Sequence, residues 1–172
     1  MKCPRCGLAV RGSIQRCPGC RFSIGDLDRR LRQVPARCGF VNDLSGLLLS
    51  EQRSSLENHL SQFYENHGGE IVLVTVTSTR PVKPSEYVFW LFNRWQVGGE
   101  THAGLMVLLA MKEHRIECEV GYAWEPIISD VESGEVLDKL VLPLLEEGRV
   151  YEALRASIEQ LVRILEQAPL TQ

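Results

Sequence analysis

Apolar positions along the C-terminal three quarters of the chain follow the spacing of buried strands. Residues 71–77 and 104–111 are almost continuously apolar or β-branched, which predicts strands buried on both faces of a sheet. Residues 115–121 alternate between apolar and polar side chains, and the three residues that separate them from the preceding run allow only an antiparallel hairpin. This pattern predicts a small mixed β-sheet.

Amphipathic stretches predict helices before, between and after these strands. Ser50 can cap a first helix, and Ser85 begins a second one that is too aromatic for a surface helix and must pack on the sheet or bury a face elsewhere. Asp130 can cap a third helix, and an apolar stripe through residues 150–165 predicts the last. The order of elements predicts an α/β fold in which helices flank the sheet.

Two Cys-x-x-Cys motifs lie near the N-terminus, formed by Cys3 with Cys6 and by Cys17 with Cys20. The ten residues between the motifs are long enough for a hairpin that brings the pairs together, which predicts a four-thiolate zinc ribbon. Because such a site leaves no coordination position for water or substrate, we expect the zinc ion to be structural. The alternatives are two redox-active dithiols or two disulfides.

Charge is divided unevenly along the chain. Residues 1–38 carry nine Lys and Arg side chains against two Asp, a formal +7, whereas residues 39–172 carry a formal −10. Four thiolates with one Zn²⁺ reduce the first value to about +5. A basic module beside an acidic one predicts either that the two dock through weak, salt-sensitive ion pairs or that the module binds an anionic partner.

The N-terminal segment lacks the apolar run of a signal peptide, and no run reaches the roughly 18 apolar residues of a membrane span. We therefore expect a cytoplasmic protein with reduced thiols. Cys118, on the inner face of a strand, and Cys38, between the modules, are expected to be buried. The predicted organisation is a zinc ribbon over residues 1–22, a basic linker over 23–39 that contains a short helix near 26–33, and an α/β domain over 40–168.

Several ordered short motifs in this domain resemble those of one known family. They are Val41-Asn-Asp43, residues 47–50 and 71–77, Trp95-Gln-Val-Gly98, and residues 104–109 and 115–125. Together they resemble the TPM domain, the family of thylakoid-lumen acid phosphatases, photosystem II repair proteins and nematode acetylcholine-receptor modulators. The resemblance spans roughly residues 40–165 and implies a sheet flanked by helices.

The resemblance also implies a divalent-cation site, for calcium especially, at acidic loops on one edge of the sheet. The matching positions are Asp43 before the first helix, Glu125 after the third strand and Asp130 at the start of the next helix. Carboxylates in loops are suitable ligands for Ca²⁺ or Mg²⁺, but each of the three also has a plain explanation as a cap, a turn residue or a solvated charge. Trp124, beside Glu125, is expected to be an exposed contact.

Three functions are consistent with these features. The first is a binding or assembly module for another protein, with a structural zinc ribbon and a Ca²⁺ or Mg²⁺ site. The second is a weak metal-dependent phosphatase, implied by the resemblance, for which Arg94 and Lys112 are the nearest cations that could hold phosphate. The third is binding of nucleic acid or another anionic partner by the basic ribbon.

Overall fold

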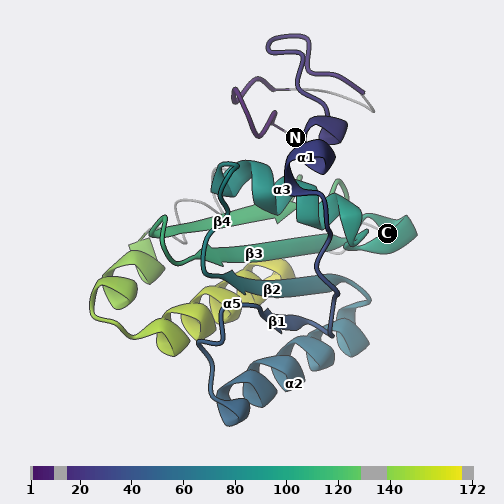
Figure 1. The fold of residues 1–172 in the computed structure, drawn as a ribbon. Coiled ribbons are helices and arrows are strands. Elements are labelled where there is room, and N and C mark those ends of the chain that lie inside the picture. The colour runs from purple at the N-terminus through teal and green to yellow at the C-terminus, as the bar shows by residue number, and fades with distance from the viewer. Residues whose placement is uncertain (1, 10–14, 129–138, 168–172) are drawn as a thin grey trace.

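Four strands form one mixed sheet in the order β1–β2–β3–β4 (Figure 1). The first three run parallel, and the fourth returns antiparallel to the third. The strands are β1 (Val41–Asp43), β2 (Glu70–Val76), β3 (Gly104–Ala110) and β4 (Arg115–Val120). The predicted mixed sheet is confirmed, and the three-residue β1 is a strand that the apolar pattern did not predict.

This computed structural model describes residues 2–9, 15–128 and 139–167. Its named helices are α1 (Ile24–Leu31), α2 (Ser50–His67), α3 (Pro84–Arg94) and α5 (Val150–Gln167), with a 3₁₀ turn, η1 (Gly99–Thr101). Residues 139–146 form a further helical stretch. Asp130 and the start of the helix predicted there lie outside the described residues. Within them, no helix has the length and apolarity required to cross a membrane.

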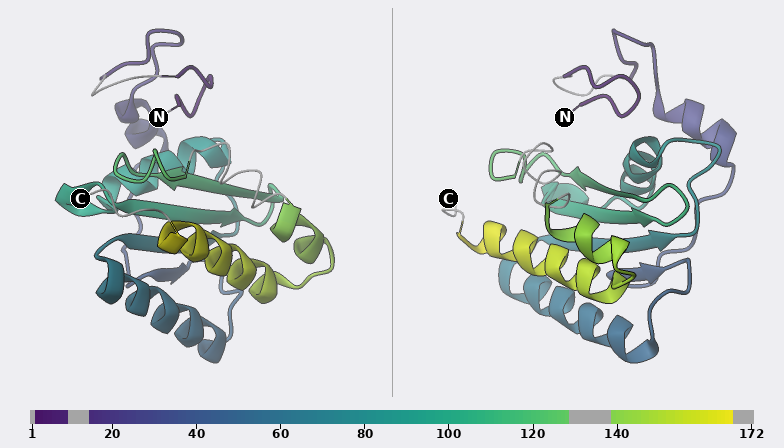
Figure 2. Two further views of the ribbon diagram at one scale, coloured as in Figure 1. Left: turned by 180° about the vertical axis from the view of Figure 1, so that it is seen from behind. Right: turned by 90° about the vertical axis from the view of Figure 1, so that its left-hand side faces the viewer.

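Helices cover both faces of the sheet (Figure 2). Leu73 of β2 points into a core that it shares with α2 and α5. Its neighbours Val72 and Val74 point to the other face, into a second core shared with α3. Burial on both faces explains why β2 and β3 have continuous apolar sequences rather than alternating ones.

The two connections between parallel strands have opposite hands. Both step in the same direction across the sheet, from β1 to β2 and from β2 to β3. The first passes through α2 on one face, and the second passes through α3 on the other. Connections that advance in one direction on opposite faces cannot share a hand, so one of them departs from the right-handed rule for such units.

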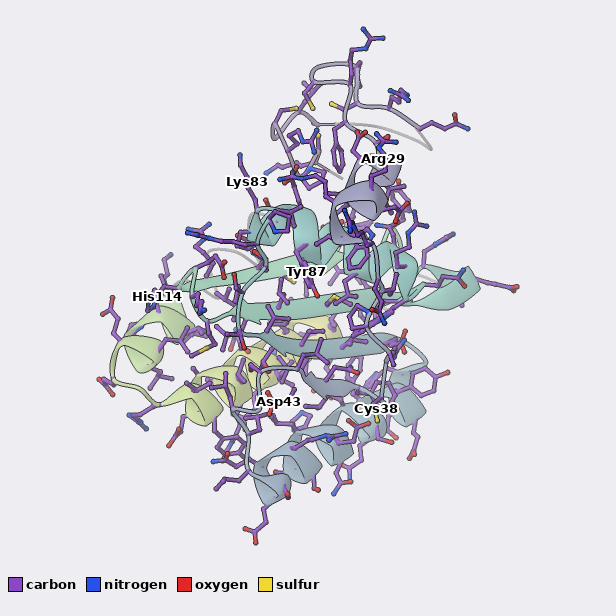
Figure 3. All side chains as sticks on the ribbon, in the orientation of Figure 1. Arg29, Cys38, Asp43, Lys83, Tyr87 and His114 are labelled. Atoms are coloured by element: carbon purple, nitrogen blue, oxygen red, sulfur yellow. The ribbon has the colours of Figure 1, made fainter. Side chains whose placement is uncertain are left out.

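The N-terminal segment packs on the outer side of α3. Leu27 of α1 is fully buried, and Phe22 joins the same core as α3 and β2. The indole N–H of Trp90 donates to Asp28 over 2.9 Å, and that of Trp95 donates to the carbonyl of Pro35 over 2.9 Å. Figure 3 shows Arg29 of α1 and Tyr87 of α3 on this same side of the sheet. Helix α3 is aromatic because it is covered on two sides.

This arrangement refines two sequence-based expectations. The short helix expected near residues 26–33 is present as α1, displaced by two residues toward the N-terminus. The sequence predicts that the N-terminal module docks through weak, exposed ion pairs. The contact in the structure is more extensive, because apolar side chains of the N-terminal segment are also buried against α3. Cys38, expected to be buried, is exposed, and Cys118 is half-buried.

Candidate metal centre and acidic edges

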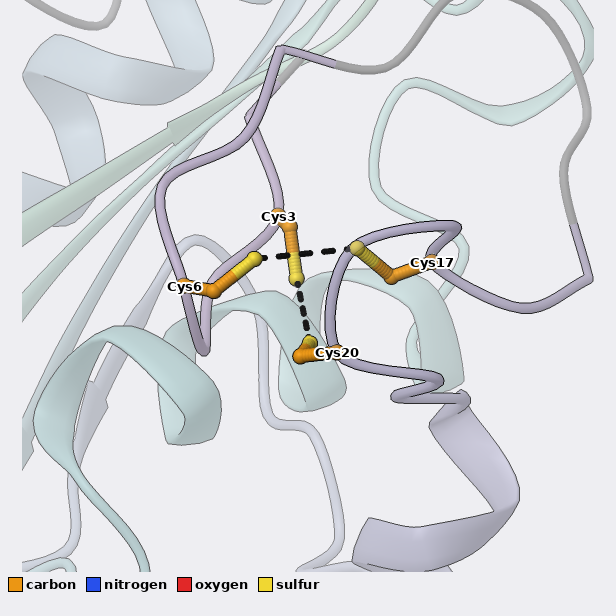
Figure 4. A group of neighbouring side chains, drawn as sticks. All are labelled: Cys3, Cys6, Cys17 and Cys20. Carbon is orange, nitrogen blue, oxygen red and sulfur yellow. Dashed lines mark hydrogen bonds between the residues drawn. The ribbon is translucent and has the colours of Figure 1, made fainter.

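The four N-terminal cysteines converge on one point (Figure 4). The Sγ atoms of Cys3 and Cys20 are 3.7 Å apart, as are those of Cys6 and Cys17, and all four lie within 4.8 Å of one another. A tetrahedron with Zn–S bonds of about 2.3 Å has sulfur–sulfur edges of about 3.8 Å. The four side chains are therefore spaced to hold one metal ion, and the spacing fits Zn²⁺.

The two Cys-x-x-Cys loops share one backbone design. In the first, the Cys3 N–H donates to the Leu8 carbonyl and the Gly7 N–H donates to the Cys3 carbonyl, over 2.9 and 2.8 Å. In the second, Cys17 and Phe22 repeat the first bond, and Arg21 repeats the second, both at 2.8 Å. Each loop thus closes on itself and aims its two thiols inward.

A left-handed residue closes each loop at the equivalent position. This residue is Gly7 in the first loop, with φ of 73°, and Arg21 in the second, with φ of 61°. Glycine adopts this conformation without steric penalty, whereas arginine does not. The second loop therefore carries backbone strain that the first avoids.

Local electrostatics favour a charged thiol at one position of the cluster and oppose it at another. The backbone N–H of Cys20 is the main group that lowers the pKa of Cys17, to about 7, and burial is the main factor that raises the pKa of Cys3, to about 12. Four thiolates at this spacing repel one another, so full deprotonation requires a cation at their centre. With four thiolate ligands a tetrahedral ion has no open position, so the centre suits a structural role.

Asp43 stands at the carboxyl end of β1 and organises the loop that leads into α2. Its carboxylate accepts the N–H groups of Leu47 and Leu48, over 3.1 and 2.8 Å, and the hydroxyls of Ser45 and Thr75. Burial raises the pKa of Asp43, but these donors outweigh burial and hold it below its ordinary value. Asp43 is a loop-forming residue whose oxygens already have four protein donors.

Glu125 lies at the other end of the sheet. It follows β4, which runs antiparallel to β3, and Val120 at the end of β4 pairs with Leu105 near the start of β3. Asp43 is level with Thr75, which pairs with Leu109 at the far end of β3. Four residues of β-strand span about 13 Å. Asp43 and Glu125 are too far apart to ligate one ion.

The structure therefore brings together four of the seven metal-ligand candidates taken from the sequence. Within the described ranges, the cysteine cluster is the one group of His, Cys, Asp and Glu side chains with metal-binding spacing. Asp43 and Glu125 remain separate, and Asp130 lies outside those ranges. Neither edge assembles the predicted calcium or magnesium site from described residues.

Several residues of the family-like motifs have packing roles. A Cβ atom at Gly69 would lie 2.0 Å from the Trp124 ring, and one at Gly98 would lie 2.6 Å from the backbone nitrogen of Gly104. Trp124 is only 9% exposed, so the prediction of an exposed contact was wrong. The sequence signal for this packing was the position of the glycines, with Gly69 directly before β2 and Gly104 at the first residue of β3.

Comparison with known proteins identifies relatives of the α/β part. The family model described as "TPM domain" matches residues 41–164. The fold is similar to the N-terminal domain of a Porphyromonas gingivalis protein ("P.gingivalis" in its title), with a TM-score of 0.70 and 24% identity over 74% of this chain and 82% of that one. The N-terminal domain of a Corynebacterium glutamicum protein gives a TM-score of 0.60 and 14% identity over 81% and 92%.

A third similar structure is a protein of the psychrophilic bacterium Bizionia argentinensis, with a TM-score of 0.61 and 14% identity over 72% of this chain and 85% of that one. None of the curated sequences compared with the chain matches it. At these identities the three structures support the fold alone.

Proposed function

The chain belongs to the TPM domain family, and we propose that it is a binding module in which a structural zinc ribbon is attached to a TPM domain. The observation that carries the proposal is the convergence of Cys3, Cys6, Cys17 and Cys20 within 4.8 Å, on backbone loops of identical hydrogen bonding. A closed site of this kind supplies folding free energy rather than catalysis. A zinc tetrathiolate requires reduced thiols, which supports a cytoplasmic location.

The basic side chains of the N-terminal segment fall into two groups. One group is paired with carboxylates: Arg5 and Arg30 with Glu86, and Arg37 with Glu70, both in the TPM domain, whereas Arg29 pairs with Asp26 within the segment. The other group consists of exposed cations with no carboxylate partner among the described residues: Lys2, Arg16, Arg21 and Arg32. The first group attaches the segment to the TPM domain, and the second remains available for an anionic partner.

We propose an acidic protein surface as that partner. Residues 39–172 carry a formal −10, which opposes a long polyanion such as nucleic acid close to the ribbon. An acidic patch of limited size avoids this repulsion. Each ion pair at such an exposed interface contributes at most about 1 kcal/mol, so the complex should be weak and salt-sensitive.

The phosphatase hypothesis receives less support from the geometry. Arg94 ends α3 and pairs with Asp28, whereas Lys112 lies in the β3–β4 hairpin at the opposite end of the sheet. These two cations cannot hold one phosphate. Asp43, the carboxylate nearer to Lys112, is occupied by four protein donors.

Two measurements test the proposed function. Metal analysis of protein purified without chelator should give one zinc per chain, and Cys17→Ser should lose it. Binding to an acidic peptide and to a duplex oligonucleotide should then be compared over a salt series. The Arg16→Gln/Arg21→Gln variant should weaken peptide binding, and a matched Arg155→Gln/Arg163→Gln variant on α5 should not. Absence of zinc, or equal peptide binding by both variants, would contradict the proposal.

A further inference from the structure

The first cysteine loop reaches the TPM domain through Arg5, which lies between Cys3 and Cys6. Its Nε donates to Glu86 Oε1 of α3 over 2.7 Å, and its guanidinium sits 4.6 Å from the centre of the Phe22 ring. The carbonyl of Phe22 in turn accepts the N–H of Cys17. A single arginine thus connects both cysteine loops to α3.

Glu86 is a buried carboxylate that depends on the N-terminal segment. Its residue is 3% exposed. Its second oxygen accepts the Lys83 N–H over 3.2 Å at the start of α3 and lies 3.9 Å from the guanidinium of Arg30. If Arg5 is removed while the ribbon stays in place, this buried carboxylate loses its closest cation, which is strongly unfavourable.

A second polar contact and an aromatic contact support the same attachment. The Ser85 hydroxyl donates to the carbonyl of Pro4 over 3.0 Å, within the same cysteine loop. Phe22 meets Phe89 of α3 edge to face, with ring centres 5.9 Å apart. Both contacts require the folded cysteine loops, because Pro4 and Phe22 lie inside or directly after them.

From these contacts we infer that Glu86 is a positioning residue for the zinc centre, so that zinc binding and attachment of the ribbon to α3 form one coupled equilibrium. The inference rests on the zinc site of the proposed function. Coupling is reciprocal: if α3 stabilises the metal-bound ribbon, zinc must stabilise the covered state of α3 by the same factor. Loss of zinc then uncovers the side of α3 that contacts Phe22 and Leu27.

The test measures zinc affinity of the full chain by competition with a chromogenic chelator. Glu86→Gln should weaken zinc binding about 10-fold or more, at the lower end of what loss of supporting interactions around a metal site produces. The matched control is Glu51→Gln, which changes an exposed glutamate in the first turn of α2 and should leave the affinity within about 2-fold. Arg5→Leu serves as a second variant, because it removes the same contact without altering α3.

Hydrogen exchange provides a readout that zinc affinity alone does not. Removal of zinc from the wild-type chain should raise exchange of the α3 amides and leave those of α2 unchanged. The coupling is refuted, and the zinc site is not, if Glu86→Gln and Arg5→Leu both bind zinc as tightly as the wild type. The same holds if hydrogen exchange of the α3 amides does not change when zinc is removed. A wild-type chain that binds no zinc would overturn the proposed function itself.

Discussion

Replacement of Asp43 by asparagine separates a structural role from a metal-binding role for this residue. The asparagine has one acceptor oxygen and one NH₂ group in place of two acceptor oxygens. If the oxygen faces the Leu48 N–H, then the NH₂ group takes the place of Oδ1, which now accepts the Leu47 N–H. The Ser45 and Thr75 hydroxyls can turn to accept from this NH₂ group, whereas the Leu47 N–H cannot. In the opposite orientation, the NH₂ group faces the Leu48 N–H. One donor is left without an acceptor in either case (Figure 3 shows the position of Asp43).

An unsatisfied buried donor costs about 1–3 kcal/mol, and the loss of charge from the remaining hydrogen bonds adds to this. We expect Asp43→Asn to destabilise the chain by about 3 kcal/mol. For a domain of this size that corresponds to a fall in melting temperature of about 6–12 °C. Thermal unfolding followed by circular dichroism measures the change, with Glu100→Gln at an exposed position as the control.

The effects of pH and of added cations distinguish a structural role of Asp43 from a metal-binding role. Since the folded state holds the pKa of Asp43 below its ordinary value of 3.8, its stabilising effect is present above that value and is lost as the pH falls through the lowered pKa. The difference between wild type and Asp43→Asn should shrink accordingly in acid. It should be the same with and without millimolar Ca²⁺ or Mg²⁺. A variant as stable as the wild type, or destabilised only when the cation is present, would refute a purely structural role.

Three further predictions follow from individual positions. Arg21→Gly should relieve the backbone strain in the second cysteine loop and stabilise the metal-bound ribbon by up to about 1 kcal/mol, measured as tighter zinc binding, whereas Gly7→Ala should weaken zinc binding. A zinc affinity of Arg21→Gly equal to that of the wild type would contradict the strain. Gly69→Ala should lower the melting temperature and expose Trp124, seen as a red shift of its fluorescence, because the new methyl group would lie 2.0 Å from the indole. Cys38→Ser should leave zinc content unchanged, because Cys38 lies outside the four-sulfur cluster; loss of zinc would assign it to the site.

The predictable parts of the fold are those with local causes. Continuous or alternating apolar side chains predict strands β2, β3 and β4. The spacing of the cysteines alone predicts the two metal-binding loops. Strand β1 has only three residues, too few for a periodic pattern. The packing of α1 on α3 was not predictable. The aromatic sequence of α3 indicates that the helix is buried on more than one side, but it does not indicate which segment covers it.

The separation of Asp43 from Glu125 had a signal in the sequence. A tight hairpin after residue 111 reverses the chain, so a residue that follows β4 must lie at the opposite end of the sheet from one that follows β1. Family resemblance grouped the two carboxylates by their motifs, whereas strand direction separates them. Strand direction is the stronger physical argument, because ligands must meet in space.

The contact between Arg5 and Glu86 also has a consequence for biosynthesis. The two residues are 81 positions apart, so the ribbon leaves the ribosome well before α3 is made. Phe22, which closes the second loop, precedes Glu86 by 64 residues, so at about 5–20 residues per second the completed loops wait roughly 3–13 seconds. The cysteine loops can capture their metal during that interval, since their closure needs only neighbouring residues. Metal loading can therefore precede docking, in which case the ribbon would meet α3 as a preformed unit.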